Sequence, residues 1–247
     1  MQFILEIILI VLVTGLIQSI LFVIGYGLGR LHLAQSAIKR LKWSFGVGVG
    51  IWLLILGVLA GLGFFENFEV YPPRILMVLL LPFAVSLLLL FSRFFNIWLK
   101  SIPRRWLLFA QSYRVFLELL LWFGFTIGMI PFHLTFVGFN FDIVVGLTAI
   151  PAGLLFFRKG RLLRFEAMVW NVFGLLLLVY NSFIFLISLP YSFQVFNIAP
   201  SNPFLTQFPF IWIPGFLVPL AAALHVFSLK QLLNPDKRRS FSLRKRG

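Results

Sequence analysis

Residues 3–28 read FILEIILIVLVTGLIQSILFVIGYGL, and Glu6 is the one charged side chain in the run. An α-helix needs about 20 apolar residues to cross the hydrocarbon of a bilayer, because each residue rises about 1.5 Å. The stretch is long enough, and it lacks the positively charged start and short apolar core of a cleaved signal peptide. The sequence therefore predicts a retained transmembrane helix at this position.

The whole chain shares this apolar character. Hydrophobic residues make up 61% of its 247 residues, charged residues make up 11%, and the mean hydropathy is +1.02. Because a soluble domain carries about a quarter charged residues, lipid must cover most of this surface. The predicted fold class is an all-α, polytopic transmembrane helix bundle in residues 1–233, followed by a basic cytoplasmic tail, 234–247. The seven predicted spans are residues 3–28, 45–65, 75–95, 106–130, 142–157, 166–189 and 211–231.

The positions of Lys and Arg predict how the bundle is oriented. Of the 21 basic residues, all but Arg74 and Arg114 lie in every second connection between spans or in the tail. Lys and Arg resist translocation, so these connections are expected to face the cytoplasm, with the N-terminus outside. The chain is therefore predicted to be a multi-pass protein of the cell inner membrane. The basic segments are Arg30 to Lys42, Arg93 to Arg105, Arg158 to Arg164 and the tail from Lys230.

Charge and cysteine content exclude several classes of function. The formal net charge is +14, but it is divided among short connections, so no basic face for nucleic acid is expected. Anionic lipid headgroups at the cytoplasmic face are the expected partners of these residues. The chain has no cysteine, which excludes disulfides and thiolate metal sites. His32, His133 and His225 fall at different membrane levels, so no metal, cofactor or catalytic residue is predicted.

Polar residues on one face of the fourth predicted span are the clearest functional signal. Gln111, Arg114 and Glu118 are spaced i, i+3 and i+7, so they share a helical face. Arg114 and Glu118 are four residues apart and are expected to neutralise each other. An ionisable group inside a membrane is costly and usually faces a partner or a cavity.

Other spans offer polar partners at the same depth. Asn171, His225 and Gln18 are each expected in the inner half of a span. They predict a polar pocket that opens toward the cytoplasm; the alternative is an internally satisfied ion pair that sets helix register. The predicted ligand-binding residues are Gln111, Arg114, Glu118, Asn171 and His225.

Three sequence features carry a resemblance to a known family. They are Gln111-Ser-Tyr-Arg114 with Glu118, the segment Gly138-Phe-Asn-Phe-Asp142, and Phe210-Ile-Trp-Ile-Pro-Gly-Phe-Leu-Val-Pro219 with His225. In their order the chain resembles an uncharacterised bacterial family of seven-span inner-membrane proteins. That family has no known activity, so the resemblance implies topology and location alone.

The sequence leaves three functions open. The leading hypothesis is binding or transport of a small or lipophilic ligand in the polar pocket. A second is an accessory or scaffolding subunit, whose helices contact a membrane-protein partner or a second copy of the chain. A third is a lipid-modifying enzyme that uses Glu118 or His225 as acid or base, and this is the less favoured reading.

Overall fold

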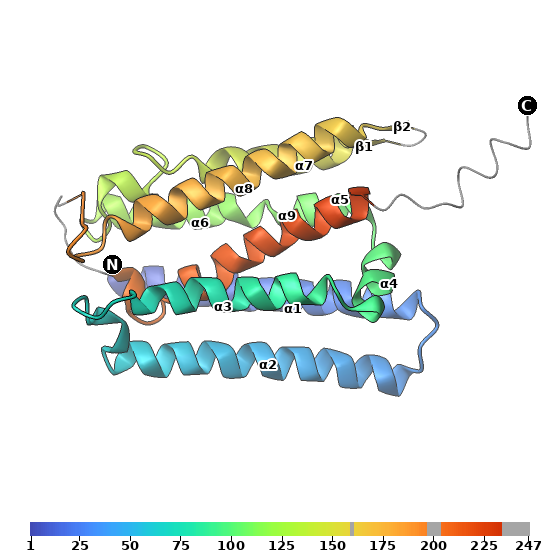
Figure 1. Ribbon diagram of the computed structural model, residues 1–247, viewed down its shortest axis with the longest axis horizontal. Coiled ribbons are helices and arrows are strands. Elements are labelled where there is room, and N and C mark those ends of the chain that lie inside the picture. The colour runs from blue at the N-terminus through green and yellow to red at the C-terminus, as the bar shows by residue number, and fades with distance from the viewer. Residues whose placement is uncertain (159–160, 197–203, 234–247) are drawn as a thin grey trace, which may run out of the picture.

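The computed structural model describes residues 1–158, 161–196 and 204–233, so the predicted basic tail lies outside the described residues. The described chain forms an elongated bundle whose long helices run along one axis (Figure 1). The helices are α1 (Gln2–Gly29), α2 (Gln35–Gly61), α3 (Arg74–Leu89), α4 (Arg93–Ser101), α5 (Arg104–Ala110), α6 (Tyr113–Thr126), α7 (Asp142–Phe156), α8 (Arg164–Leu186) and α9 (Val218–Leu233). Short 3₁₀ turns are η1 (Phe64–Glu66), η2 (Phe132–Leu134) and η3 (Phe204–Thr206), η4 (Ile213–Leu217) is a π-helix, and β1 (Phe157–Arg158) pairs with β2 (Arg161–Leu162).

The helices have the length and composition of membrane spans. Among the described residues, five are long and apolar enough to cross a bilayer, or six if the bent pair α3 and α4 is one span. In this count, α5 and α6 together form one candidate span, and η4 and α9 together form another. The fifth predicted span coincides with α7, which is apolar but has only 15 residues. The all-helical class is therefore shown, with five or six helices that could span a membrane, whereas the number of seven spans and their orientation stay predictions.

Apolar side chains cover the outside of the bundle. On α1 and α2, Phe22 is 64% exposed and Leu54 is 66% exposed, and many neighbours are similar. Contiguous apolar surface on this scale is unfavourable in water and typical of contact with lipid. The helix α2 begins at Gln35 rather than at the predicted residue 45, so it carries Lys39 to Lys42 within its first turns.

The last helix lies at the centre of the bundle. Helix α9 contacts α3, α5 and α8, and α7 contacts α5, α6 and α8. Helix α1 lies between α2 and α6, which leaves α2 at the edge (Figure 1). Because α9 is surrounded, it has little lipid contact, and polar side chains on α5, α6 and α8 can reach it.

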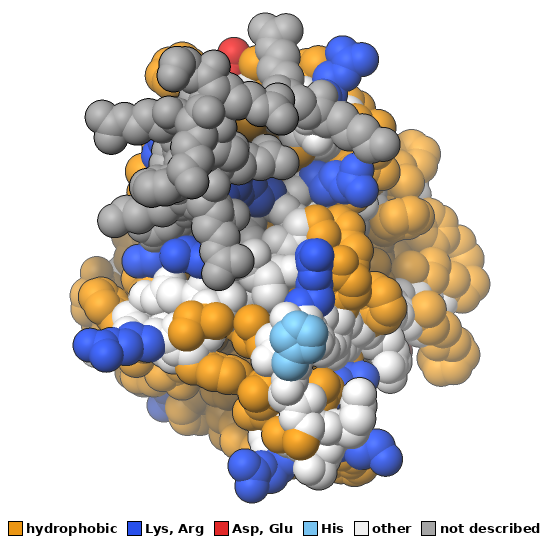
Figure 2. Space-filling model, turned by 90° about the vertical axis from the view of Figure 1, so that its right-hand side faces the viewer, with side chains coloured by type: hydrophobic (Ala, Val, Ile, Leu, Met, Phe, Trp, Pro, Cys, Tyr) orange, Lys and Arg blue, Asp and Glu red, His pale blue; other side chains and the backbone are white. Residues whose placement is uncertain are grey.

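Lys and Arg gather at one end of the bundle. This basic end carries Arg30 to Lys42, Arg93 to Arg105 and Arg158 to Arg164, and Figure 2 shows it with Lys and Arg side chains around apolar ones. The opposite end, here called the loop end, carries residues 62–73 and 127–141. In the described part of the chain, Arg74 is the basic residue at the loop end, where its Nη1 donates to the Phe64 carbonyl at 2.9 Å.

A short amphipathic helix turns across the basic end. Helix α4 is bent by 86° from α3, and its first turn is capped by Ser92, whose Oγ accepts from the Phe95 amide at 3.2 Å. Ser101 Oγ donates to the Gly27 carbonyl at 2.9 Å, which ties α4 to α1. The predicted role of this segment in holding anionic lipid stays a prediction.

Proline and tryptophan together shape the start of α9. Pro219 has no N–H, so the carbonyl of Gly215, four residues earlier, has no helical donor. The Trp52 indole N–H of α2 donates to this carbonyl at 2.8 Å. In addition, the Trp212 indole N–H donates to the Leu53 carbonyl at 3.0 Å. These two bonds join η4 to α2, and they satisfy the Gly215 carbonyl and both indole N–H groups, which lipid cannot do.

Candidate functional site

Close helix packing places the polar groups of α6 and α7 beside each other. A Cβ on Gly146 of α7 would lie 2.8 Å from the backbone nitrogen of Val115 in α6, so only glycine permits this approach. Asp142 lies one helical turn before Gly146, at the first position of α7, and Arg114 directly precedes Val115. The contact therefore brings the Asp142 carboxylate to the Arg114 guanidinium.

Arg114 and Asp142 form a buried ion pair. Arg114 Nε donates to Asp142 Oδ2 at 2.8 Å, and Nη2 donates to Oδ1 at 2.6 Å. Arg114 is 1% exposed and Asp142 is 7% exposed. The predicted partnership of Arg114 with Glu118 is therefore wrong. Glu118 is one helical turn from Arg114 and could approach it. However, the planar guanidinium forms two parallel hydrogen bonds with the Asp142 carboxylate of α7 instead.

His225 and Asn171 continue the network toward the basic end. Arg114 Nη1 lies 3.2 Å from His225 Nε2, and His225 Nδ1 lies 3.0 Å from Asn171 Oδ1. A guanidinium can only donate, so Nε2 must accept and the proton of the ring lies on Nδ1. That proton is donated to Asn171, whose Nδ2 in turn donates to the Ala167 carbonyl at 2.7 Å. His225 is therefore neutral. Both of its ring nitrogens, and both polar atoms of the Asn171 side chain, have a hydrogen-bond partner.

Asn140 joins the ion pair to Glu118 on the other side. Its Nδ2 donates to Glu118 Oε1 at 2.8 Å, and its Oδ1 accepts from the Asp142 amide at 3.1 Å. Asn181 Nδ2 of α8 donates to Asp142 Oδ1 at 2.9 Å. Glu118 is 1% exposed, and its second oxygen, Oε2, is buried without a hydrogen-bond partner. Asn181 Oδ1 is also buried and unpartnered.

Gln111 and Gln18 lie apart from this network. Gln111 Nε2 donates to the Ala221 carbonyl at 3.0 Å, which joins the α5–α6 break to α9, and Tyr113 Oη donates to the Leu217 carbonyl at 2.5 Å, which joins α6 to η4. Gln18 is exposed on α1 in an open groove beside Trp106. Of the predicted residues, Arg114, Asn171 and His225 hydrogen-bond directly, whereas Glu118 connects to them through Asn140 and Asp142.

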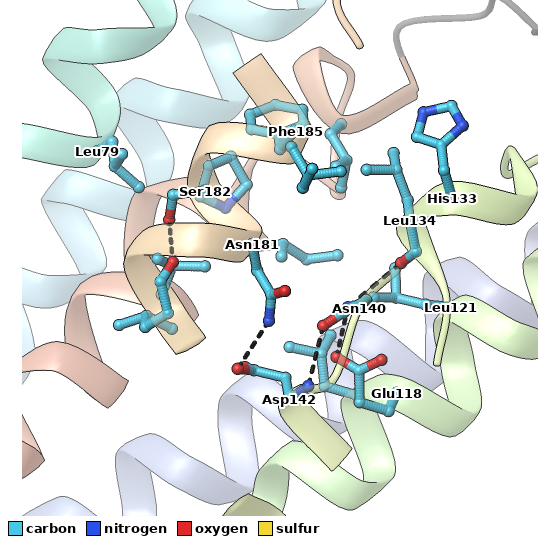
Figure 3. A pocket seen from close by; sticks show the side chains of 17 residues that line it. Leu79, Glu118, Leu121, His133, Leu134, Asn140, Asp142, Asn181, Ser182 and Phe185 are labelled. Carbon is cyan, nitrogen blue, oxygen red and sulfur yellow. Dashed lines mark hydrogen bonds between the residues drawn. The ribbon is translucent and has the colours of Figure 1, made fainter. Parts of the chain in front are cut away.

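A cavity lies beside Glu118 at the loop end of the bundle (Figure 3). Its volume is about 80 Å³, enough for several waters or for a small organic group. We call it the Glu118 cavity. This cavity is near the start of α7 and the end of α8, so Glu118 faces a cavity at the loop end, and a pocket that opens toward the basic end stays a prediction. The polar lining residues of the Glu118 cavity are Glu118, His133, Asn140, Asp142, Asn181 and Ser182, and its apolar ones include Leu79, Leu121, Leu178, Phe185, Leu205 and Val218.

His133 lines the same cavity from the 131–141 connection. It is 1% exposed, and neither ring nitrogen has a hydrogen-bond partner. Its ring is stacked on Phe196, with centroids 4.7 Å apart. Burial lowers the pKa of His133 below its ordinary value, because the charged imidazolium loses its hydration.

The Glu118 cavity combines a few polar side chains with a mostly apolar lining. Within the described ranges, no three His, Asp or Glu side chains gather as metal ligands. Two residues that line the Glu118 cavity each have a buried, unpaired acceptor oxygen, Glu118 Oε2 and Asn181 Oδ1, and most of the other lining residues are apolar. A few convergent polar atoms in an apolar cavity are typical of a small-molecule site.

Sequence reasoning found Glu118 but missed Asp142, Asn140 and Asn181. Asp142 is the first residue of the fifth predicted span, and an acidic residue at the start of an apolar helix is a recognisable signal. Comparison of the chain with models of protein families, with characterised proteins and with solved structures found no match.

Proposed function

We propose that this chain is a multi-pass protein of the cell inner membrane that binds a small or lipophilic ligand in the Glu118 cavity. The observation that carries the binding proposal is the buried, unpartnered Oε2 of Glu118 beside that cavity. A polar atom in this setting loses its hydration and gains no hydrogen bond, which is unfavourable by roughly 1–3 kcal/mol. Ionisable groups within membrane helices are retained mostly where they bind or carry something.

The proposed topology has seven spans, with the N-terminus outside and the C-terminus in the cytoplasm. It counts α7 as a span and α3 with α4 as another. The short α7 is compatible with local thinning of the bilayer, which costs only fractions of a kcal/mol per Å. In this topology the basic end faces the cytoplasm and the Glu118 cavity lies toward the outside.

Single cysteines test the topology cleanly, because the natural chain contains none. Asn67→Cys places an exposed thiol at the loop end, and Ser36→Cys places one at the basic end. In intact cells stripped of any outer barrier, a membrane-impermeant maleimide is expected to label Asn67→Cys but not Ser36→Cys. Permeabilised cells should show both labelled, and the cysteine-free chain is the control. Labelling of Ser36→Cys alone in intact cells would reverse the proposed orientation.

Ligand binding is tested by a thiol placed in the cavity. Ser182 lines the cavity from α8, so we expect Ser182→Cys to react with the small neutral reagent methyl methanethiosulfonate. The test repeats the reaction with purified protein in lipid nanodiscs, in the presence of butylammonium, butanol, butyramide or butyrate. At least one probe is expected to slow modification by about tenfold at saturation, which corresponds to a thiol shielded nine-tenths of the time.

The control variant for this experiment is Ser36→Cys, whose thiol lies outside the cavity. Its modification rate should not change with any probe. If no probe slows Ser182→Cys more than Ser36→Cys, the cavity does not bind small ligands and the proposed function is wrong.

A further inference from the structure

The unpaired atoms of the Glu118 cavity show what its ligand must offer. Glu118 Oε2 and Asn181 Oδ1 are both acceptors, and both are buried without a partner. The other amide and carboxylate atoms there are already bonded: Asn140 Nδ2 to Glu118 Oε1, and Asn181 Nδ2 to Asp142 Oδ1. His133, whose ring nitrogens are also unpartnered, adds one donor and one acceptor to the lining. A head group that reaches Glu118 Oε2 and Asn181 Oδ1 must donate hydrogen bonds, since a second acceptor would face lone pairs without a proton.

When Glu118 is ionised, the charges around the cavity are unbalanced by one. Glu118 and Asp142 are both carboxylates, and Arg114 is bonded to Asp142 by two of its nitrogens. His225 is neutral because its Nε2 accepts from Arg114. Among the described residues that line the cavity there is no Lys or Arg. An ionised Glu118 is thus the uncompensated charge, and its complement is a single positive charge on the ligand.

The rest of the lining selects the kind of cation. A bare divalent ion such as Ca²⁺ takes about 6–8 oxygen ligands, whereas most side chains here are hydrocarbon. Leu121, Leu178 and Phe185 are apolar parts of the lining that suit an alkyl or aryl group, and Figure 3 labels Leu121 and Phe185 among them. An ammonium group has three N–H donors, enough for Glu118 Oε2 and Asn181 Oδ1 together.

We propose that the ligand of the Glu118 cavity is a small protonated amine with an apolar body, whose ammonium group donates to Glu118 Oε2 and Asn181 Oδ1. This inference rests on the proposed function, since it names the chemical class that the same cavity binds. It makes Glu118 the counter-charge of the ligand. It also gives the Arg114–Asp142 pair a supporting role, because that pair orients Asn140 and Asn181 without adding net charge.

The test compares the four probes on Ser182→Cys, because they share a similar apolar body and differ in the head group. Butylammonium is expected to slow modification at a concentration about tenfold lower than butanol or butyramide, and butyrate is expected to give no protection. The tenfold difference corresponds to one charge-assisted hydrogen bond to a partly desolvated carboxylate. Equal protection by butanol and butylammonium, or stronger protection by butyrate, would overturn the amine inference while the proposed function stood.

A second variant locates the selectivity at Glu118. Glu118→Gln in the Ser182→Cys background keeps the shape of the side chain and an oxygen for Asn140, but it removes the charge. The preference for butylammonium over butanol is expected to disappear. Glu166→Gln is the matched control, because Glu166 is an exposed acid at the start of α8 and should leave the preference unchanged. A preference that survives Glu118→Gln would overturn the assignment of the counter-charge.

A measurement on the unsubstituted site keeps the inference testable if Glu118→Gln does not fold. The cationic reagent aminoethyl methanethiosulfonate should modify Ser182→Cys about tenfold faster than the anionic sulfonatoethyl reagent, relative to their rates on Ser36→Cys. Equal relative rates, or a faster anionic reagent, would contradict a cation-selective cavity.

Discussion

Arg114→Met is expected to lower the free energy of unfolding by about 3–5 kcal/mol, because it leaves the buried Asp142 carboxylate without its cation. Asp142 would keep its hydrogen bond from the Asn181 amide, at 2.9 Å. His225 Nε2 would lose the Arg114 N–H from which it accepts a hydrogen bond. Methionine has a similar length and is apolar, so the effect reports the lost charge rather than a cavity. Reversible unfolding in detergent or lipid, followed by tryptophan fluorescence, measures the change.

The double variant Arg114→Met with Asp142→Asn is the control for this prediction. It removes both charges at once, so it is expected to be clearly more stable than Arg114→Met alone, since paired removal is often close to neutral. With the single variant Asp142→Asn measured as well, the double-mutant cycle gives the coupling energy of the pair. A cost below about 1 kcal/mol for Arg114→Met would mean that the ion pair does not hold α6 to α7.

Gly174→Ala is the second substitution with a large expected effect. A Cβ on Gly174 of α8 would overlap the His225 ring at Cε1 and Nε2. The ring cannot turn away freely, because it is held between Arg114 and Asn171 at 3.2 and 3.0 Å. Overpacking of this kind costs about 1–3 kcal/mol, and breaking a buried hydrogen bond adds to it. The same unfolding measurement checks the loss.

Gly50→Ala is the matched control for Gly174→Ala. Gly50 is also in a helix, but a Cβ there would have no neighbour within 4 Å. Alanine is intrinsically more favourable than glycine inside a helix by about 0.5–1 kcal/mol, so Gly50→Ala is expected to be neutral or slightly stabilising. Equal losses for the two variants would show that the contact with His225 is not the cause.

Several features of the bundle could be read from the residues because they depend on local hydropathy. Apolar runs such as residues 3–28 and 166–189 became α1 and α8 with shifts of a few residues. The helix boundaries at 35 and 89 were less predictable. A helix can continue beyond the hydrocarbon into basic residues, as α2 does, and α3 ends where Ser92 caps the next helix.

The functional cluster shows where local reasoning stops. Spacing along one helix placed Glu118 next to Arg114, yet the partner of Arg114 is Asp142, 28 residues later. That choice depends on the close approach of α6 and α7 at Gly146, which is a property of two helices in contact. Depth along the spans correctly suggested that Arg114, Asn171 and His225 are near one another, because depth follows from the rise per residue.

The sequence alone determined that the chain is apolar and helical, and that its cations gather on alternate connections, because hydropathy and charge act on each segment separately. Only the tertiary structure decided which carboxylate pairs with Arg114, which one keeps an unpaired oxygen, and at which end the cavity lies. Those outcomes depend on the rotation and offset of α6, α7 and α8 against one another. Such offsets are set by close contacts between residues far apart in the chain, and no single segment contains them.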